Sequence, residues 1–515
     1  MTPRAITSLA DIVRVHGRDR PAAPALVVDE HTISFGELDA RSSRAAQAFA
    51  AAGIGFGDRV AFVERNGAEF FEVVFGLAKL GAVAVPVNWR LAAPEMRHVV
   101  EDSGATLVVV GQDFFDHIEA IEAHLHAGII AIGAHDRWPR FDDWVAGHAA
   151  IDPGVTTAAD DLVFLMYTSG TTGLPKGVML SNANYQCKTA GIAGPWRFSS
   201  DCVSLAVMPL FHMAGSGWAL AGLWAGATTV VLREVDPVAI LHAVTRHHVT
   251  NLLLVPAVIA SLLDTAGLRA AELTHLRVIV YGAAPISEDV LVRGIQRVGA
   301  VFAQVYGMTE TTGSITQLDS VDHVPELLRS CGKPYPWVQV RIVAEDGTDA
   351  APGTVGELWT RSDQNMLGYW NNADATAAIL TADGWLRTGD AGYLDADGYV
   401  FLQDRIKDMI VSGGENVYPV EVENVLMTHP GVADAAVIGV PDDKWGEAVK
   451  AFVVPGPDTT LHEAELIGFA RERLAGFKLP KSVDFLAALP RTPSGKVLKR
   501  ELRDPYWAGV GRQIG

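Results

Sequence analysis

The chain is short of cysteine and of positive charge, and each shortage excludes a class of protein. Only three cysteines, Cys187, Cys202 and Cys331, occur among 515 residues, and no two of them have C-x-x-C or metal-ligand spacing. This favours buried thiols in a reducing compartment over a disulfide framework or a zinc site. With 41 Lys and Arg against 60 Asp and Glu, the formal net charge is −19. A surface of that sign suits neither the phosphate backbone of a nucleic acid nor an anionic lipid layer.

Targeting and membrane-spanning segments are not evident either. The N-terminal residues MTPRAITSLADIVRVHG lack the apolar core of a secretory signal, and we therefore expect a cytoplasmic protein. Residues 202–232 contain no Asp, Glu, Lys or Arg, a run long enough to cross a bilayer. Because Pro209, His212 and four glycines interrupt it and a β-branched run ends it, we interpret it as a buried helix followed by a buried strand. Contact with a membrane is expected to be peripheral at most.

Several familiar motifs are missing as well. The chain has no G-x-G-x-x-G, H-E-x-x-H or G-x-S-x-G, and the order Lys176-Gly177-Val178 does not fit the Walker pattern. What is present is the segment YTSGTTGLPKGVMLS at 167–181. Freed backbone N–H groups and hydroxyl side chains suit a polyphosphate, and a lysine adds a point charge. The residues that could do this are Thr168, Ser169, Gly170, Thr171, Thr172 and Lys176.

The pattern along the chain predicts more than one domain, as the length of 515 residues also does. Strands expected at 228–233, 251–255, 276–281 and 301–306 alternate with helices, one of which begins at Asp236-Pro237. This predicts an α/β fold of mainly parallel sheets sandwiched by helices, with ligands at the carboxyl ends of the strands. After about residue 330, short segments at 337–343, 355–360 and 399–402 indicate a small antiparallel, β-barrel-like region. A compact α+β unit follows, with helices at 420–427 and 462–474 and strands at 435–440 and 449–454.

The segment at 167–181 resembles the signature loop of the adenylate-forming superfamily, which includes acyl- and aryl-CoA synthetases, luciferases and peptide-synthetase adenylation domains. Further matches follow in order: MPLFH at 208–212, YGAAP at 281–285, YGMTE at 306–310, TGD at 388–390, DRIKDMIVSGGENVYP at 404–419 and PSGK at 493–496. The longest of them is especially similar to bacterial fatty-acyl-CoA synthetases. The resemblance implies an AMP-binding domain at 1–404 and a small mobile C-terminal domain at 405–515, with a hinge at 405–408.

The resemblance also implies an ATP site. The segment from Thr168 to Thr172 and Lys176 would hold the β- and γ-phosphates. Tyr306 would stack on adenine and Asp390 would bind the ribose hydroxyls. The other nucleoside contacts would be Gly282, Ala283, Ala284, Gly307 and Arg405. Thr309 would touch the α-phosphate, and Glu310 would hold Mg²⁺, which prefers oxygen ligands and keeps waters.

Residues near the C-terminus would complete the reaction. A carboxylate that attacks the α-phosphate brings two anions together, and the resemblance places Lys496 between them. Lys407 occupies the family's hinge position, where rotation would exchange Lys496 for the loop at 412–416 and open a thiol channel. Contacts to CoA would come from Gly413, Gly414, Trp445, Phe477 and Lys481. They are less firmly placed than the ATP contacts, because Leu479 stands where some relatives carry a basic residue.

The acyl pocket is expected along the uncharged stretch. His212 would mark the wall between the pocket and the thiol channel, with Met213, Ala214 and Trp218 after it. Since the stretch has no Arg or Lys to match a second carboxylate, we expect a hydrophobic acid, first of all a medium- or long-chain fatty acid. An aryl acid of the coumarate or ferulate type and a polycyclic acid are the alternatives.

The predicted enzyme is therefore an AMP-forming acyl-CoA synthetase. It would use ATP, Mg²⁺ and CoA to convert the acid to an acyl-adenylate and then to acyl-CoA, releasing pyrophosphate and AMP. A stand-alone enzyme that loads a carrier protein is a second possibility. A nucleotide-binding protein without catalysis is a third, which the presence of every expected catalytic residue disfavours. The sequence leaves open the acid and whether the chain forms a homodimer.

Overall fold

A computed structural model describes residues 6–168, 175–265, 273–284, 286, 288–405, 408–412, 415–442, 445–457, 459–491 and 497–508, with only the backbone at 404, 405, 411, 415 and 416. The chain divides into two compact units. The larger unit comprises Met1–Leu328, Pro334–Gln339 and Arg361–Leu386, and the smaller unit comprises Arg329–Lys333, Val340–Thr360 and Arg387–Gly515. The predicted boundary at residue 404 and the hinge at 405–408 remain predictions, and Lys407 lies outside the described residues.

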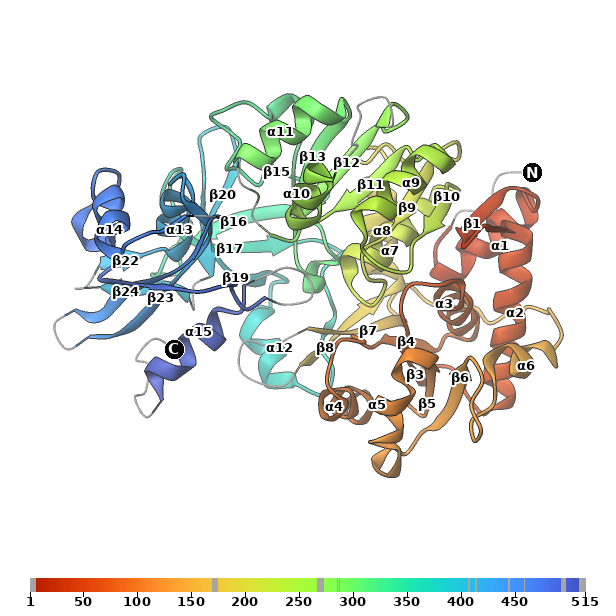
Figure 1. Ribbon diagram of the computed structural model, residues 1–515. Helices are drawn as coiled ribbons and strands as arrows, with labels where there is room; N and C mark the ends of the chain where they lie inside the picture. The colour runs from red at the N-terminus through yellow and green to blue at the C-terminus, as the bar shows by residue number, and fades with distance from the viewer. Residues whose placement is uncertain are drawn as a thin grey trace. The chain divides into compact units, whose positions relative to one another are not determined.

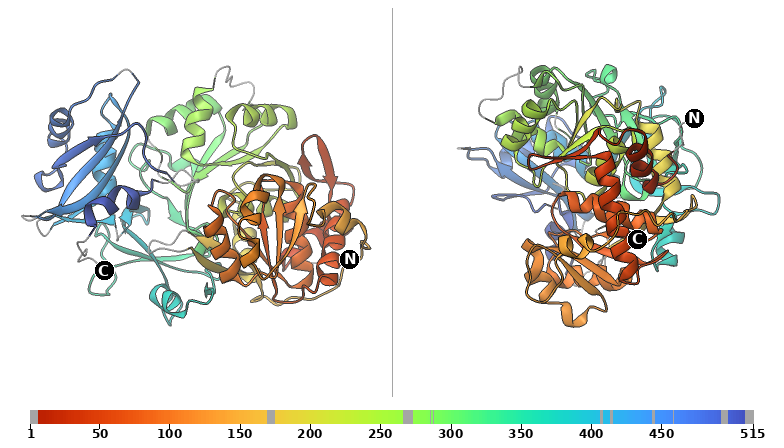
Figure 2. Two further views of the ribbon diagram at one scale, coloured as in Figure 1. Left: turned by 60° about the horizontal axis from the view of Figure 1, so that its bottom comes forward. Right: turned by 90° about the vertical axis from the view of Figure 1, so that its right-hand side faces the viewer.

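Two sheets form the framework of the larger unit (Figures 1 and 2). The seven-stranded sheet has the order β18 (Gly368–Tyr369), β8 (Lys176–Ser181), β7 (Leu162–Thr168), β4 (Val83–Pro86), β3 (Arg59–Val63), β5 (Leu107–Gly111), β6 (Gly128–Ile132). The nine-stranded sheet has the order β15 (Lys333–Pro334), β14 (Thr316–Leu318), β13 (Val301–Tyr306), β12 (Val278–Gly282), β11 (Asn251–Leu254), β9 (Val203–Ala206), β10 (Thr228–Val231), β1 (Pro24–Val28), β2 (His31–Ser34). In the seven-stranded sheet, neighbouring strands are parallel all the way from β7 to β6 along this order. In the nine-stranded sheet, they are parallel all the way from β13 to β1.

Both sheets are covered on both faces, as the apolar strands require. Side chains alternate along a strand, so Val60 and Phe62 of β3 enter one core while Ala61 and Val63 enter another. The first core lies between the two sheets and takes helices from both halves of the unit, namely α1 (Leu9–Asp19), α2 (Phe35–Ala51), α3 (Ala68–Leu80), α6 (Phe141–Ala146), α7 (Asn182–Ile192) and α8 (Met213–Trp224). The outer faces are covered by α4 (Ala93–Ser103) and α5 (Phe115–Glu119) on one sheet and by α9 (Pro237–His247), α10 (Pro256–Asp264) and α11 (Glu288–Val298) on the other.

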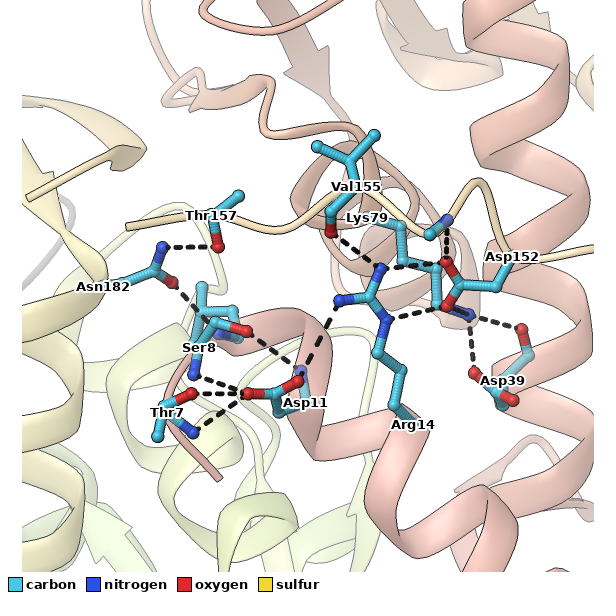
Figure 3. A network of polar contacts seen from close by, with 12 residues as sticks. Thr7, Ser8, Asp11, Arg14, Asp39, Lys79, Asp152, Val155, Thr157 and Asn182 are labelled. Carbon is cyan, nitrogen blue, oxygen red and sulfur yellow. Dashed lines mark hydrogen bonds and ion pairs between the residues drawn. The ribbon is translucent and has the colours of Figure 1, made fainter. Parts of the chain in front are cut away.

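A network of polar contacts fixes the N-terminal helix to this core (Figure 3). Arg14 of α1 donates from Nε and Nη2 to the two carboxylate oxygens of Asp152, at 2.7 and 2.9 Å. Lys79 of α3 is fully buried, and its Nζ donates to the carbonyl oxygen and Oδ1 of Asp39 at 2.8 and 2.6 Å and to Ser43 Oγ at 2.7 Å. A buried ammonium is tolerated only with such partners, so the network holds α1, α2 and α3 in one arrangement.

The smaller unit contains two further sheets. One has the order β16 (Gln339–Val343), β17 (Gly356–Arg361), β19 (Leu386–Leu394), β20 (Val400–Arg405). The other has the order β22 (Glu415–Val417), β21 (Ile410–Ser412), β24 (Gly446–Pro455), β23 (Val432–Asp442), with β25 (Ser482–Phe485) also paired to β24. Helices α13 (Pro419–Met427) and α14 (Glu463–Arg471) share a core with this sheet, and α15 (Lys499–Trp507) contacts β23.

The predicted elements are confirmed, with ends shifted by a few residues. The uncharged stretch contains buried helix α8 followed by buried strand β10. Asp236 caps α9, accepting from Val238 N–H at 2.9 Å, and Pro237 is the first residue of that helix. The remaining described elements are α12 (Ala373–Ile379) and the short 3₁₀ turns Gln112–Phe114, Glu122–His124, Thr309–Thr311, Ser320–Asp322 and Gly476–Lys478. Within the described ranges, no helix is both long and apolar enough to span a membrane.

Candidate active site

The hairpin of β7 and β8 carries the two ends of the predicted phosphate loop. Thr168, the last residue of β7, is paired with Lys176, the first residue of β8. A Cβ on Gly177 would lie 2.9 Å from Leu165 Cδ1, so a larger residue at this position would require that leucine side chain to move. Ser169, Gly170, Thr171 and Thr172 lie outside the described residues. The pairing therefore positions Thr168 and Lys176 side by side at the mouth of that segment.

Lys176, Tyr369 and Glu310 meet beside this hairpin. Strand β18 pairs with β8, and the ring of Tyr369 lies 5.4 Å from Lys176 Nζ, at a distance that permits a cation–π contact. The Tyr369 hydroxyl donates to Glu310 Oε1 at 2.7 Å, and Met366 N–H donates to the Glu310 carbonyl at 2.8 Å. The Glu310 side chain is buried, with 6% of the residue exposed. A lysine and a carboxylate are thus linked through one phenol.

The surroundings of Glu310 fit a magnesium ion that keeps most of its own ligands. Among the described residues, no group of three or more His, Cys, Asp or Glu side chains is close enough to form a complete metal cage. A single carboxylate oriented by a tyrosine leaves the other positions of an octahedral ion to water and phosphate oxygens, as Mg²⁺ prefers. Glu310 is the described residue that would hold it.

The expected nucleoside residues lie at the carboxyl ends of two neighbouring parallel strands. Gly282, which ends β12, pairs with Val305 of β13, and Tyr306 is the last residue of β13. A Cβ on Gly282 would overlap the carbonyl oxygen of Val305, and one on Gly307 would lie 2.5 Å from the backbone nitrogen of Ser314. Because both glycines are in contact with backbone rather than with flexible side chains, neither can be replaced without moving the chain.

The other expected residues of this edge adjoin those glycines. Ala283 has φ +65° and is exposed, while Ala284 and Tyr306 are half-buried. Thr309 begins the 3₁₀ turn that carries Glu310. The residues expected to contact the adenine edge and the α-phosphate therefore share one end of the nine-stranded sheet.

His212 forms the N-cap of α8. Its Nδ1 accepts a hydrogen bond from Ala214 N–H at 3.2 Å, so a neutral ring carries its proton on Nε2. Burial lowers the pKa of His212, which favours that neutral form at pH 7. Met213 and Trp218 are buried and Ala214 is half-buried. The predicted pocket residues thus lie on the first turns of one helix.

A lysine that the sequence did not point to lies against the same helix. Lys188 of α7 is buried, and its Nζ donates to the carbonyl oxygen of Gly217 at 2.7 Å. The expectation of a hydrophobic acid rests on the absence of Lys and Arg from residues 202–232. The packing of α7 on α8 brings a buried lysine from outside that stretch against the same helix.

In the smaller unit, Asp390 and Arg405 are paired residues of β19 and β20. Asp390 is 7% exposed, and its N–H donates to Thr388 Oγ1 at 3.1 Å. Gly389 has φ +69°, and its N–H donates to Glu357 Oε1 at 3.2 Å. These bonds fix the turn that presents the Asp390 carboxylate; of Arg405 only the backbone is described.

The expected CoA residues include an exposed aromatic ring. Trp445 is 38% exposed, and Lys481 Nζ lies 5.4 Å from its ring centroid. Phe477 is half-buried in the turn Gly476–Lys478. Gly413, Gly414, Lys407 and Lys496 lie outside the described residues, so their roles remain predictions.

Comparison with known proteins agrees with this geometry. A family model described as "AMP-binding enzyme" matches residues 13–370, and one described as "AMP-binding enzyme C-terminal domain" matches residues 421–496. The chain belongs to the AMP-binding enzyme family. The resemblance to the adenylate-forming superfamily, the α/β fold and the enzyme class, an AMP-forming acid–thiol ligase, are confirmed.

Relatives of this AMP-binding enzyme match it over nearly its whole length. The fatty acid–[acyl-carrier-protein] ligase ScoC of Streptomyces coeruleorubidus is 40% identical over 99% of this chain and 98% of that ligase. A feruloyl-CoA synthase of an Amycolatopsis species is 39% identical over 94% of this chain and 96% of the synthase. The crystal structure of ATP-bound MatB from Rhodopseudomonas palustris has 32% identity and a TM-score of 0.90, over 98% of this chain and 100% of MatB.

Two of the residues described above, Tyr369 and Lys188, were not predicted. Tyr369 reaches Glu310 only because β18 pairs with β8, a two-residue pairing between segments far apart in the chain. Lys188 occurs in an ordinary helical segment of mixed polarity. No local pattern marks either residue, and only packing between distant elements reveals them.

Proposed function

We propose that this AMP-binding enzyme converts a hydrophobic carboxylic acid, first of all a medium- or long-chain fatty acid, to an acyl-adenylate and then to its CoA thioester. The observation that carries the proposal is the cluster of Lys176, Tyr369 and Glu310. It places a cation suited to phosphate and a carboxylate suited to Mg²⁺ on the larger unit that also carries the expected nucleoside residues at its strand ends.

The first step makes the acid reactive. A carboxylate oxygen attacks the α-phosphorus of ATP, the bond to the bridging oxygen of the β-phosphate breaks, and pyrophosphate leaves with the bonding electrons. Lys176 holds the leaving phosphates, and Thr309 contacts the α-phosphate. Glu310 would hold Mg²⁺, which neutralises phosphate charge when bound. Lys496 brings the two anions together, as one positioned cation can lower such a barrier strongly.

The second step transfers the acyl group. The thiolate of the acceptor attacks the acyl carbon, AMP leaves, and a thioester remains. His212, the N-cap of α8, forms the wall between the acyl pocket and the thiol channel in this proposal, and its neutral ring adds no charge to this wall. Rotation at Lys407 separates the two steps by removing Lys496 from the site.

The thiol is proposed to be CoA rather than a carrier protein. The exposed Trp445 beside Lys481 supports this, because an aromatic face and an ammonium suit an adenine nucleotide with phosphates. The relatives named above include both a CoA enzyme and a carrier-protein enzyme, and loading of a carrier protein is the second candidate. An aryl or polycyclic acid is the alternative to a fatty acid.

The test is AMP formation from ATP with a panel of acids, run with CoA, with a phosphopantetheinylated carrier protein, and with neither. We expect acid-dependent AMP formation that requires CoA. If AMP forms only with the carrier protein, the carrier protein replaces CoA as the acceptor in the proposal. If no acid gives AMP with either acceptor or with neither, the proposal is refuted.

Lys496→Ala separates the two steps. The variant is expected to lose adenylate formation by several powers of ten and to keep thioester formation from a supplied acyl-adenylate. An equal loss in both half-reactions would show that Lys496 has another role.

A further inference from the structure

Lys188 is a buried lysine, and none of the described residues supplies a carboxylate to pair with its amine. It is 1% exposed, and among the described residues its ammonium meets the carbonyl oxygen of Gly217 at 2.7 Å and the ring of Trp196 at 5.3 Å. An ammonium has three hydrogens to donate, so this carbonyl leaves two of them unused. Burial lowers the pKa of Lys188 to about 7. Lys79, which is also fully buried, differs in having Asp39 as its partner.

A second unused donor lies on the adjoining helix. Trp218 is 2% exposed, and within the described part of the chain its Nε1–H has no acceptor. Its ring lies 5.3 Å from that of Trp196 and 4.8 Å from that of Phe198. Trp196 Nε1–H, by contrast, meets Gln317 Oε1 and the Tyr335 hydroxyl, both at 3.0 Å. The region thus offers unused donors in an aromatic environment, where unsatisfied polar groups cost free energy.

Lys188 and the loop that carries Glu310 are connected through Met213. A Cβ on Gly313, three residues after Glu310, would lie 2.6 Å from Met213 Cγ. A Cβ on Gly217 would lie 2.7 Å from Met213 Sδ and 3.0 Å from Lys188 Nζ. Gly217 is four residues after Met213, about 6 Å along the helix axis. Lys188 is therefore about one helical turn beyond the point where α8 contacts that loop.

Packing alone does not account for a lysine at this position. A methionine would fill a similar volume without the cost of desolvating an ammonium. The two unused ammonium hydrogens and the indole N–H need an acceptor, and an oxygen atom of a bound molecule can supply it.

We propose that Lys188, together with Trp218 Nε1–H, recognises an oxygen acceptor at the far end of the carboxylic acid that the enzyme activates. This rests on the proposed function and narrows its substrate to acids that carry a hydroxyl, a carbonyl or a second carboxylate at the end remote from the reacting carboxylate. The rest of the acid remains apolar and lies against Met213 and the tryptophans.

The experiment compares matched acids: octanoate, 8-hydroxyoctanoate and octanedioate, and cinnamate with 4-hydroxycinnamate. For each acid, kcat and KM are measured from AMP formation, and binding is measured by calorimetry without ATP. The variants are Lys188→Met, which removes the donors, and Lys188→Gln, which keeps an uncharged N–H donor. Lys450→Met, in the smaller unit, is the control for loss of a buried lysine beside an aromatic ring; unlike Lys188, Lys450 is paired with a carboxylate, that of Asp484, at 2.9 Å.

The full-length wild type is expected to prefer an oxygen-bearing acid over its hydrocarbon partner by about 10- to 100-fold in kcat/KM, the range for a hydrogen bond to a charged group. Lys188→Met should abolish that preference by raising KM for the oxygenated acid, and leave the hydrocarbon acid unchanged or improved. If the acceptor is neutral, as in the hydroxy acids, Lys188→Gln should show the preference that Lys188→Met has lost. It should not show a preference for octanedioate, whose second carboxylate is charged. If Lys188→Gln shows no preference for any of the oxygen-bearing acids, recognition requires the positive charge of Lys188, as it would for an anionic group.

Equal losses for all acids in Lys188→Met would overturn the proposal, as would a wild type without any preference. If no acid gives AMP, the proposed function fails, and the binding comparison between wild type and Lys188→Met still decides whether Lys188 recognises the acid. Failure of every probe to bind would count against Lys188 as well. Thermal melting checks folding, and Lys188→Met is expected to melt no lower than wild type.

Discussion

The phenol of Tyr369 offers a sharp test of how the site holds Glu310, the carboxylate proposed to bind Mg²⁺. Its hydroxyl donates to Glu310 Oε1 at 2.7 Å, while its ring faces Lys176 Nζ at 5.4 Å. Tyr369→Phe removes the first interaction and keeps the ring for the second. A hydrogen bond to a charged acceptor contributes about 1.5–3 kcal/mol, so adenylate formation at saturating ATP and acid should slow by about 10- to 150-fold.

The assay is acid-dependent exchange of pyrophosphate into ATP, measured over a range of Mg²⁺ concentrations. The variant should remain slow at saturating Mg²⁺, and it should form thioester from a supplied acyl-adenylate at close to the wild-type rate. Tyr506→Phe is the control, because that hydroxyl donates to Asp484 Oδ2 at 3.1 Å on an exposed surface. A Tyr369→Phe enzyme within about twofold of wild type in exchange would refute this role for the phenol.

Three further predictions concern other parts of the chain. Gly307→Ala should lower the melting temperature and slow adenylate formation at least tenfold, an increase of about 1.4 kcal/mol in the activation free energy. The reason is that the new Cβ would lie 2.5 Å from the backbone of the following loop. Gly147→Ala is the control, because its Cβ would contact no atom, and it should change neither property. Burial raises the pKa of Glu72 from 4.5 to about 7. Between these pH values the folded state therefore binds more protons than the unfolded state. The free energy of unfolding should decrease as the pH rises from 4.5 to about 7. Denaturant titrations should show that the free energy of unfolding of Glu72→Gln does not decrease over this pH range. A wild-type free energy of unfolding that increases with pH over the same range would contradict the prediction. Trp445→Ala should raise KM for CoA about tenfold, a loss of about 1.4 kcal/mol, and leave KM for ATP unchanged; an unchanged KM for CoA would favour a carrier protein as acceptor.

Much of the fold could be predicted because its signals are local. The alternation of apolar runs with capped helices predicts β10, α9, β11, α10, β12 and β13 in order, and Asp236 and Pro237 mark a helix start by their own chemistry. Parallel strands bring their carboxyl ends to one edge, so the proximity of Gly282 to Val305 and Tyr306 was also predictable.

Contacts made by side chains from distant segments were not predictable. Tyr369 and Glu310 are 59 residues apart in the chain, and Lys188 and Gly217 are 29 apart. Whether two such residues meet depends on the register of a two-residue strand or on how one helix is rotated against another, which no single-sequence pattern encodes. Lys188 was not predicted for this reason, because it lies outside the uncharged stretch and meets α8 only through packing.

The two glycines at the strand ends have a consequence for how such an enzyme can change over time. Gly282 and Gly307 are constrained by contacts with backbone atoms, so that edge of the expected nucleoside site leaves little room for substitution. The acid pocket is expected along α8, where a substitution of a side chain can alter shape or polarity without moving the chain. Conserved nucleotide chemistry and variable choice of acid can therefore coexist in one fold, as the different acids in the names of its relatives suggest.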